Sequence, residues 1–419
     1  MPKIVQIKAR EILDSRGWPT VEAEVWLENE IFGRAGVPAG ASTGQAEAKE
    51  LRDNKISRYG GRGVLTAVKN IETEIAQALV NQNWDQTSLD KKLIELDDTD
   101  DKARLGANGI LAVSLAFAKA SAIEQKISLF KYFGALANNN IFTLPRPMIN
   151  ILNGGAHAKN STDIQEFLII PIDTSNFSES LERCTQVYHA LGEIISQRGL
   201  SSAVGDEGGY VPAVKSNQGA LDLIMEAIKT SGLAPGTEMA LGLDVAASEL
   251  FQNGQYYFKL DNEKLNAEQL TKKYRVWRDS YPLISIEDPF AEEAWSDTTK
   301  LTKDFGKDFQ IVGDDLFTTN LTRLKKGIEL GAGNAILIKP NQIGTITETI
   351  EVFKFAKNAG YKTIISHRSG ETGDTTIAHL AVGLNAGQIK TGAPDRGERT
   401  AKYNELLRIE EMLQKWLTL

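Results

Sequence analysis

Two patterns of hydrophobic and polar positions divide the chain. In the first, residues 19–27 (PTVEAEVWL) alternate apolar and acidic side chains, which predicts a half-buried strand of an antiparallel sheet. Residues 63–80 and 105–125 repeat apolar positions at helical spacing and predict helices. Three asparagines at 138–140 and the prolines of LPRP interrupt this pattern, so we predict an α+β domain over residues 1–138.

The second pattern, over residues 139–419, consists of short apolar runs that end on charged or polar side chains. Examples are MALGLDVA, PLISIEDP, FQIVGDDL, NAILIKPN, KTIISHRSG and GQIKTG, with helical stretches such as residues 345–360 between them. The marked polar positions follow one another at intervals of 23 to 43 residues. These intervals are close to the roughly 30 residues of one strand–helix unit in a (β/α)₈ barrel.

A closed barrel explains this second pattern better than an open sheet. A doubly wound α/β sheet has a similar repeat, but it does not so naturally gather the ends of six successive strands around one point. In a barrel the parallel strands all end at the same mouth. We therefore predict an α/β fold, with an eight-stranded TIM-type barrel over residues 139–419 that follows the smaller α+β domain.

Charge and composition narrow the classes of partner. The chain of 419 residues has a net charge of −8, a sequence pI of about 5.3 and no Lys/Arg cluster, so we expect no nucleic-acid partner. The sequence contains no run of about 18 apolar residues, and no membrane span is expected. Its single cysteine, Cys184, excludes an intramolecular disulfide and is typical of a reducing cytosol, which predicts a cytoplasmic protein.

Three carboxylates, Asp244, Glu287 and Asp314, each follow an apolar run directly. Converging at one barrel mouth, they would repel one another unless a hard divalent cation lay between them, and Mg²⁺ suits such oxygen ligands. Each one taken singly is as well explained as a helix N-cap or a turn residue. Three at successive strand ends favour a metal site.

Lys339 in ILIKPN lies between these carboxylates and the segment SHRSG. A lysine inside a barrel mouth is costly unless it is paired or deprotonated. Beside a cation its pKa would fall, which makes Lys339 a candidate general base. The alternative is a structural lysine that pairs with a neighbouring carboxylate such as Asp315.

Glycine-flanked loops carry further candidates. GDEGG contains Glu207, NGGAHAKN contains His157, and Glu166 borders the apolar run EFLII. Glycines let the backbone approach a ligand closely, and two carboxylates near each other raise one pKa and supply a proton donor. The corresponding structural alternatives are a plain tight turn and a hydrogen-bonded structural histidine.

The segment SHRSGET and the lysine of QIKTG supply the opposite charge. Arg368 is a planar fork that pairs with phosphate or carboxylate oxygens, Ser369 adds a hydroxyl, and Lys390 adds a second cation. The mouth would thus combine a cation-binding acidic half with a phosphate-binding basic half. A small substrate that carries both a carboxylate and a phosphate fits such a site.

Taken in order, GASTG, NGGAHA, GDEGG, SIEDPF, VGDDL, IKPNQIGT, SHRSGET and GQIKTGAP resemble the signature segments of the enolase family. The similarity runs from Asp14 to near the end of the sequence. It implies an irregular eight-stranded α/β barrel with an N-terminal α+β capping domain. It also implies a lyase of glycolysis and gluconeogenesis, a hydro-lyase that reversibly dehydrates 2-phosphoglycerate to phosphoenolpyruvate.

The resemblance also implies roles for individual residues. Lys339 would remove the C2 proton, and Glu207, aided by Glu166, would protonate the departing C3 hydroxyl, with His157 beside them. One Mg²⁺ would bind at Asp244, Glu287 and Asp314, and a second, arriving with substrate, at Ser42. The implied substrate-binding set is Gln165, His157, Glu166, Lys339, His367, Arg368, Ser369 and Lys390.

Two other functions remain open. One is a family member that enolises a carboxylate without a phosphate, against which SHRSG and GASTG argue. The other is a catalytically silent paralogue that acts as a binding or structural protein, against which the presence of Lys339 and Glu207 argues. By the same resemblance we expect a homodimer or an octamer of dimers, and family analogy allows a surface or secreted fraction besides the cytoplasmic one.

Overall fold

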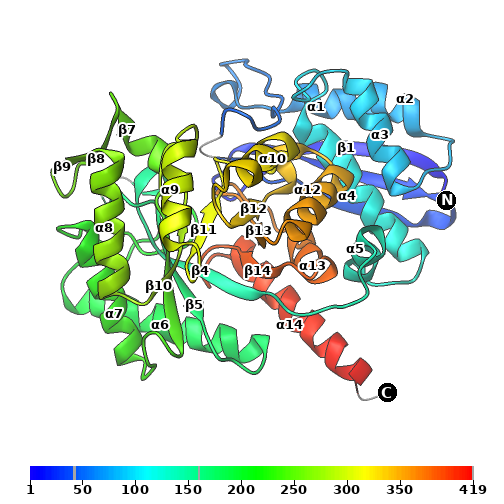
Figure 1. Ribbon diagram of the computed structural model, residues 1–419. Helices are drawn as coiled ribbons and strands as arrows, with labels where there is room; N and C mark the ends of the chain where they lie inside the picture. The colour runs from blue at the N-terminus through cyan, green and yellow to red at the C-terminus, as the bar shows by residue number, and fades with distance from the viewer. Residues whose placement is uncertain (41–43, 159–160, 418–419) are drawn as a thin grey trace.

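The computed structural model describes residues 1–40, 44–158 and 161–417, which form an N-terminal sheet covered by helices and a C-terminal barrel (Figure 1). The N-terminal elements are β1 (Ile4–Leu13), β2 (Pro19–Leu27), β3 (Phe32–Gly36), α1 (Leu65–Asn70), α2 (Ala76–Leu79), α3 (Gln86–Asp97), α4 (Ala107–Glu124) and α5 (Leu129–Ala137). Short helical turns are η1 (Glu28–Glu30), η2 (Tyr59–Gly61), η3 (Ile71–Ile75), η4 (Gly155–His157) and η5 (Ala247–Leu250).

The N-terminal sheet is antiparallel, with β2 between β1 and β3, and α4 packs across β2 and β3. The strand predicted over residues 19–27 is confirmed as β2, and the two predicted helices as α1 to α2 and as α4. The expectation that β2 is only half-buried is wrong. Glu24 on its polar face is 3% exposed, because Arg10 and Arg34 from the flanking strands pair with its carboxylate at 2.9 and 2.7 Å.

Eight strands close into the predicted barrel. They are β4 (Arg146–Asn153), β5 (Glu166–Pro171), β6 (Met239–Asp244), β10 (Leu283–Glu287), β11 (Gln310–Gly313), β12 (Ala335–Ile338), β13 (Lys362–Ser366) and β14 (Gly387–Lys390). They pair in that order, and β14 pairs with β4 to close the ring. Among these eight, β5 runs antiparallel to both neighbours while the other pairings are parallel. The irregular α/β barrel is therefore confirmed, and the open doubly wound sheet is excluded.

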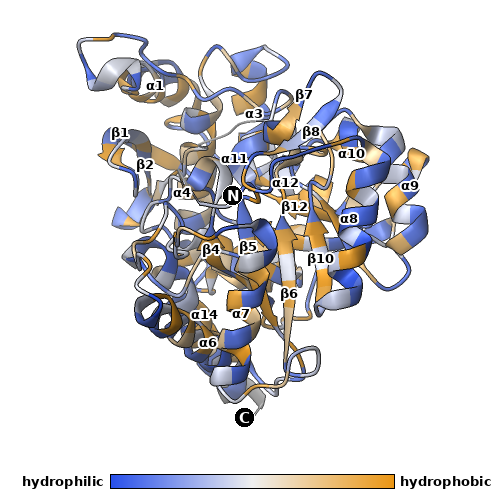
Figure 2. Cartoon of the chain, turned by 90° about the vertical axis from the view of Figure 1, so that its left-hand side faces the viewer, coloured by the Kyte–Doolittle hydropathy of each residue, from blue (hydrophilic) through white to orange (hydrophobic). Residues whose placement is uncertain are grey.

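Helices surround the barrel. They are α6 (Phe177–Gln197), α7 (Asn217–Thr230), α8 (Ala267–Ser280), α9 (Trp295–Phe305), α10 (Leu321–Leu330), α11 (Pro340–Ile343), α12 (Ile346–Asn358), α13 (Thr376–Gly383) and α14 (Gly397–Leu417). A small antiparallel sheet of β7 (Phe251–Gln252), β8 (Gln255–Phe258) and β9 (Glu263–Leu265) lies beside them. Figure 2 shows hydrophobic residues along the barrel strands and mixed hydropathy along the surrounding helices. Within the described ranges, none of the helices combines the length and apolar character needed to cross a bilayer.

Side chains at alternate strand positions fill the interior of the barrel. The inward-facing cluster consists of Met148, Leu168, Ile170, Ala240, Val312, Ala335, Leu337 and Ile364. The intervening positions, such as Ile169, Leu241 and Ile336, belong to the larger core beneath the helices. This alternation is the period-two pattern of a strand that is buried on both faces. The polar side chains of the barrel strands therefore lie toward the ends of the strands: one group is at the mouth, and Ser285, Gln310 and Gln388 form a separate hydrogen-bonded group away from it.

The reversed strand β5 brings its first residue to the mouth at which its neighbours end. Glu166 stands opposite Asp244 in the β5–β6 register, and Asp244 stands opposite Glu287 in the β6–β10 register. Three carboxylates therefore lie side by side on three adjacent strands. The irregular strand direction thus adds an acidic residue that a regular barrel would place at its other end.

Gly33 in β3 sets how closely α4 can lie on the N-terminal sheet. A Cβ at this position would lie 2.1 Å from the Ala116 carbonyl oxygen and 2.4 Å from the Ala120 nitrogen. Because both are backbone atoms of a buried helix, we expect Gly33→Ala to lower the free energy of unfolding by roughly 1–3 kcal/mol. Urea unfolding followed by circular dichroism measures this. Gly397→Ala is the matched control, since nothing lies within 4 Å of its Cβ position; equal midpoints for the two variants would contradict the prediction.

Candidate active site

The strand ends at the barrel mouth bring most of the predicted residues around one cavity. The cavity has a volume of about 20 Å³, room for about one water molecule. It is lined by Glu47, His157, Gln165, Glu166, Glu207, Asp244, Asp314, Asp315, Lys339, Ser366, His367, Arg368, Ser369 and Lys390. Of the other predicted residues, Glu287 contacts Lys390 just beneath this cavity, and Ser42 lies outside the described residues.

Lys390 is the centre of the acidic half of the site. Its Nζ lies 3.0 Å from Asp244 Oδ2, 2.9 Å from both oxygens of Glu287 and 3.2 Å from Glu166 Oε2. Burial opposes the ammonium, but these carboxylates outweigh burial and raise the pKa of Lys390 well above its usual value. Burial and the nearby Asp244 raise the pKa of Glu287. The lysine predicted to contact substrate thus lies among the carboxylates predicted to bind metal.

Lys339 follows β12 directly and pairs with Asp314. Its Nζ lies 2.5 Å from Asp314 Oδ2, while Gln342 Nε2 donates to Asp314 Oδ1 at 3.0 Å. Burial disfavours the ammonium of Lys339, but the Asp314 carboxylate outweighs burial, and the pKa of Lys339 is raised. The sequence predicted a lowered pKa for Lys339 beside a bound cation, and without a cation the pKa is raised instead. The suspected pairing with a neighbouring carboxylate exists, with Asp314 in place of Asp315.

Asp288 fixes the backbone that carries Asp314. Its carboxylate accepts the N–H groups of Asp314 at 3.1 Å and of Asp315 at 2.7 Å. Burial raises the pKa of Asp288, and burial together with Asp314 raises the pKa of Asp315 to about 8. One oxygen from each of the three residues lies within 4.8 Å of the others. Because backbone groups occupy the oxygens of Asp288, the side chains that reach the cavity are those of Asp314 and Asp315.

The donor set of the acidic half fits a hard divalent cation. Asp244, Glu287 and Asp314 offer carboxylate oxygens without thiolate or imidazole, which is the chemistry that Mg²⁺ prefers. The ammonium of Lys390 already bridges Asp244 and Glu287. A cation held by these residues would take up the same negative charge that Lys390 now balances.

Arg368 forms the basic half, and its fork is engaged by a carboxylate. Its Nη1 donates to Glu47 Oε2 at 2.8 Å and its Nη2 donates to Glu47 Oε1 at 3.2 Å, while Asn341 Oδ1 accepts from Nη1 at 3.2 Å. Both partners of this ion pair are buried. Burial alone would lower the pKa of Arg368, but the Glu47 carboxylate outweighs burial and raises that pKa above its usual value. The predicted bidentate contact of Arg368 with an oxyanion is therefore present, and the oxyanion is the carboxylate of Glu47.

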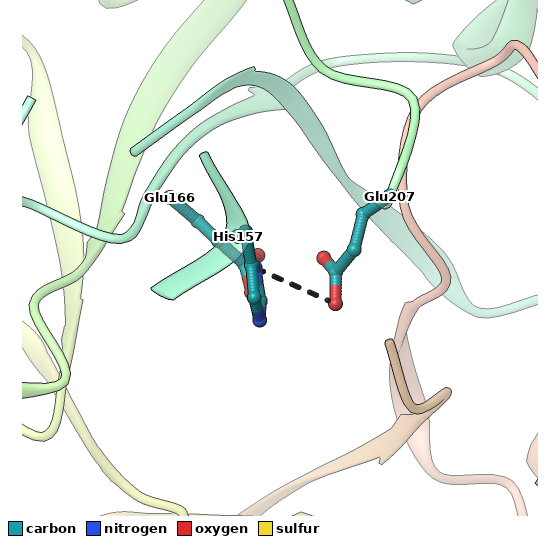
Figure 3. A group of neighbouring side chains, drawn as sticks. All are labelled: His157, Glu166 and Glu207. Atoms are coloured by element: carbon teal, nitrogen blue, oxygen red, sulfur yellow. Dashed lines mark ion pairs between the residues drawn. The ribbon is translucent and has the colours of Figure 1, made fainter. Parts of the chain in front are cut away.

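A histidine and two glutamates, His157, Glu166 and Glu207, lie close together in the lining of the cavity (Figure 3). His157 Nδ1 lies 3.7 Å from Glu166 Oε1 and 3.7 Å from Glu207 Oε1. Burial and the charge of Glu207 raise the pKa of Glu166 well above its usual value. Burial alone would also raise the pKa of Glu207, but His367 and His157 outweigh it and hold that pKa well below its usual value. The expectation that one carboxyl of the pair has a raised pKa is confirmed, and that carboxyl is Glu166.

Two further side chains hold Glu207 in place. His367 Nε2 lies 3.3 Å from Glu207 Oε2, and Asn150 Nδ2 donates to the same oxygen at 3.1 Å. Burial lowers the pKa of His367 to about 4. In the acidic half, Gln165 Nε2 donates to Asp244 Oδ2 at 3.3 Å. Each predicted side chain named here is thus fixed by at least one polar neighbour.

Several residues that support the site were not predicted from the sequence. Glu47 lies three residues after the GASTG segment, and Asp288 directly follows Glu287, so both had a signal in their position. Asn150 and Arg399 had none. Arg399 stands in a helical stretch with charges on several sides and reads as an exposed cation, yet it is fully buried. Asn150 and Arg399 contact residues of the site, but their positions in the sequence relative to the motifs do not predict these contacts.

Two family models match the chain. "Enolase, N-terminal domain" matches residues 4–133, which contain the three-stranded sheet and α1 to α4. "Enolase, C-terminal TIM barrel domain" matches residues 141–417, which contain the closed barrel and every described residue that lines the cavity apart from Glu47. The second match alone covers more than half of the chain. The chain belongs to the enolase family.

Proposed function

We propose that this chain is a Mg²⁺-dependent phosphopyruvate hydratase that reversibly dehydrates 2-phosphoglycerate to phosphoenolpyruvate. The observation that supports the proposal most strongly is that an acidic group and a basic group of side chains line the same cavity. A cluster of carboxylates suited to a divalent cation lies beside Lys339, and the buried fork of Arg368 already grips an oxyanion. Membership of the enolase family supports a lyase of this kind.

Lys339 is the proposed base. The C2 proton of the substrate is weakly acidic, because its removal places negative charge beside a carboxylate. Asp244, Glu287 and Asp314 would hold Mg²⁺, which would supply positive charge to stabilise that negative charge. Lys339 accepts the proton in its neutral form, which becomes more populated once Asp314 is engaged elsewhere, because Asp314 is what raises the pKa of Lys339. Lys390, buried and cationic, adds positive charge from the same side.

Glu207, aided by Glu166, is the proposed acid for the departing C3 hydroxyl. The unequal pKa values of the two carboxyls support a division of labour, in which Glu166 holds the proton at rest and Glu207, whose pKa is held low, receives a proton before it passes one to the leaving hydroxyl. His157 lies between them and is proposed to contact substrate, as is Gln165. A proton can reach the leaving group from either carboxyl, and the two routes are separable by substitution.

Arg368 and Ser369 are proposed to bind the phosphate, with His367, Lys339 and Lys390 completing the substrate site. The bidentate contact of Arg368 with Glu47 supports this, since a phosphate presents the same pair of oxygens to the fork. By analogy with the family we also propose a second Mg²⁺ at Ser42, a division into domains at residues 138 and 139, and a cytoplasmic homodimer or octamer of dimers.

Turnover tests the proposed function directly. The purified chain should convert 2-phosphoglycerate to phosphoenolpyruvate, followed by the absorbance of the enol product, with Mg²⁺ present and not after its removal by a chelator. Glycerate, which lacks the phosphate, should not be dehydrated. Lack of turnover with Mg²⁺ present would leave the silent paralogue as the explanation, and turnover of a phosphate-free hydroxy acid would favour the other family reaction.

Lys339→Ala separates the base from the metal site. Exchange of the C2 proton with solvent, measured by loss of deuterium from C2-labelled substrate, should fall by roughly 10²–10⁴-fold. Mg²⁺ binding, measured by calorimetry, should persist because Asp244, Glu287 and Asp314 remain. Lys272→Ala, which removes an exposed lysine paired with Glu268, is the control. Continued exchange in Lys339→Ala would exclude Lys339 as the base.

Glu207→Gln and Glu166→Gln distinguish the two routes for the acid. Glu207→Gln should keep C2 exchange while dehydration falls by roughly 10²–10⁴-fold. Glu166→Gln should lower dehydration less, because the amide keeps the hydrogen-bonding shape and Glu207 remains. Equal loss in both variants would assign proton delivery to the pair, and loss of exchange together with dehydration in Glu207→Gln would contradict its role as acid.

A further inference from the structure

Arg399 in α14 is a fully buried guanidinium behind the active site. Its Nη1 donates to the Arg368 carbonyl oxygen at 2.6 Å and lies 2.7 Å from His367 Nδ1. Its Nη2 donates to the carbonyl oxygens of Asp206 at 3.1 Å and Ser369 at 2.5 Å. One side chain thus joins the loop that carries Glu207 to the loop that carries Arg368, without lining the cavity.

The contact with Arg399 determines which nitrogen of His367 carries the proton. A guanidinium has N–H donors and no acceptor, and it does not lose its proton in proteins. The 2.7 Å contact therefore requires a lone pair on His367 Nδ1. The ring proton of a neutral His367 must then be on Nε2, which lies 3.3 Å from Glu207 Oε2 and donates to it.

The surroundings of His367 keep this ring neutral. Among the described residues, the charged groups with the largest effect on its pKa are Glu207 from the neighbouring loop, Arg399 from α14 and Glu371 from its own loop. Burial has the largest effect and lowers the pKa of His367, and Arg399 lowers it further, while the two carboxylates act in the opposite direction. Close packing holds the group together, since a Cβ on Gly392 would lie 2.9 Å from Arg399 Cδ and 3.1 Å from His367 Cε1.

We infer that Arg399 is a positioning residue that fixes His367 as the neutral Nε2–H tautomer, so that Glu207 always faces a neutral hydrogen-bond donor. The opposite tautomer would turn a bare lone pair toward the Glu207 carboxylate and repel it. A doubly protonated ring would place a full positive charge there. Either change would alter the affinity of Glu207 for a proton.

The consequence for catalysis rests on the proposed function. If Glu207 protonates the leaving hydroxyl, the tautomer of His367 sets the pH at which Glu207 is ready to do so. Loss of Arg399 should then shift the pH profile of kcat in the dehydration direction, whereas a purely structural role would lower kcat without moving the profile. The tautomer itself does not depend on whether the chain turns over substrate.

Magic-angle-spinning ¹⁵N NMR of the full chain, labelled at histidine and sedimented, tests the inference. The sequence has only four histidines, and His367→Gln identifies the His367 signals by their loss. In the wild type we expect a protonated Nε2 and a hydrogen-bonded, unprotonated Nδ1 at pH 7, with the ring becoming cationic only near a pKa of about 4. In Arg399→Met the ring should titrate about one pH unit higher or more, or adopt a mixture of tautomers.

Two further variants keep the result decisive. Arg399→Lys retains a cationic donor without an acceptor and should preserve the Nε2–H tautomer. Arg399→Gln offers an amide that can either donate to Nδ1 or accept from it, so a mixture of tautomers is expected. This pair decides the matter if Arg399→Met does not fold. Lys402→Met is the matched control, because Lys402 is fully buried on the same helix and contacts Glu371 and the Thr372 carbonyl. It should leave the tautomer of His367 unchanged.

The outcomes separate the inference from the proposed function. A His367 ring that is cationic or protonated on Nδ1 in the wild type at pH 7 would overturn the inference. So would Arg399→Met or Arg399→Gln with a wild-type spectrum and titration. If the wild type shows the expected tautomer but no turnover, the proposed function fails while the positioning role of Arg399 stands.

Discussion

Local cancellation of buried charge is the constraint on which this active site depends. Lys390 on β14 meets carboxylates from β5, β6 and β10 within about one hydrogen-bond length, and all four side chains are almost completely buried. Removing one partner from such a group leaves an uncompensated charge in a medium that solvates it poorly, which is far more costly than the pair is stabilising. Closure of the barrel between β14 and β4 is what brings the cation to the carboxylates. The fold and the charge balance therefore depend on each other.

The sequence predicts the barrel and most of the site because strand ends leave a clear signature. A charged residue directly after an apolar run must leave the core at the mouth, and this placed Asp244, Glu287 and Lys390. The same reasoning failed on β2, where alternation suggested an exposed acidic face. Arg10 and Arg34 reach across from the neighbouring strands and cover Glu24. Cross-strand pairing of long side chains is not encoded in the period of one strand, so burial of its polar face could not be predicted from that strand alone.

The supporting residues were beyond sequence reasoning for a different reason. Arg399 and Lys402 stand three residues apart on α14, where an arginine and a lysine are ordinary surface residues. Both are buried because their donors end on backbone carbonyls and on acceptor groups of the SHRSGET segment. Those acceptors come from a loop some thirty residues earlier in the chain, and only the closed barrel brings helix and loop together. The roles of Arg399 and Lys402 depend on contacts with a segment distant in the sequence, so the local sequence around them does not predict those roles.

Charge cancellation also links the two halves of the site. Glu47 balances Arg368 one to one, whereas Lys390 and Lys339 together face four carboxylates, so the protein's own cations are all engaged and the acidic half keeps an excess of carboxylates. A phosphorylated acid bound between the two halves would add several negative charges at once beside Glu47, and the guanidinium of Arg368 cannot bind both with the same two nitrogens. Either Glu47 gives up its place or additional positive charge enters with the substrate. The proposed second cation at Ser42, five residues before Glu47, answers this requirement, because a divalent ion offsets the added charge where the protein has already used its own cations.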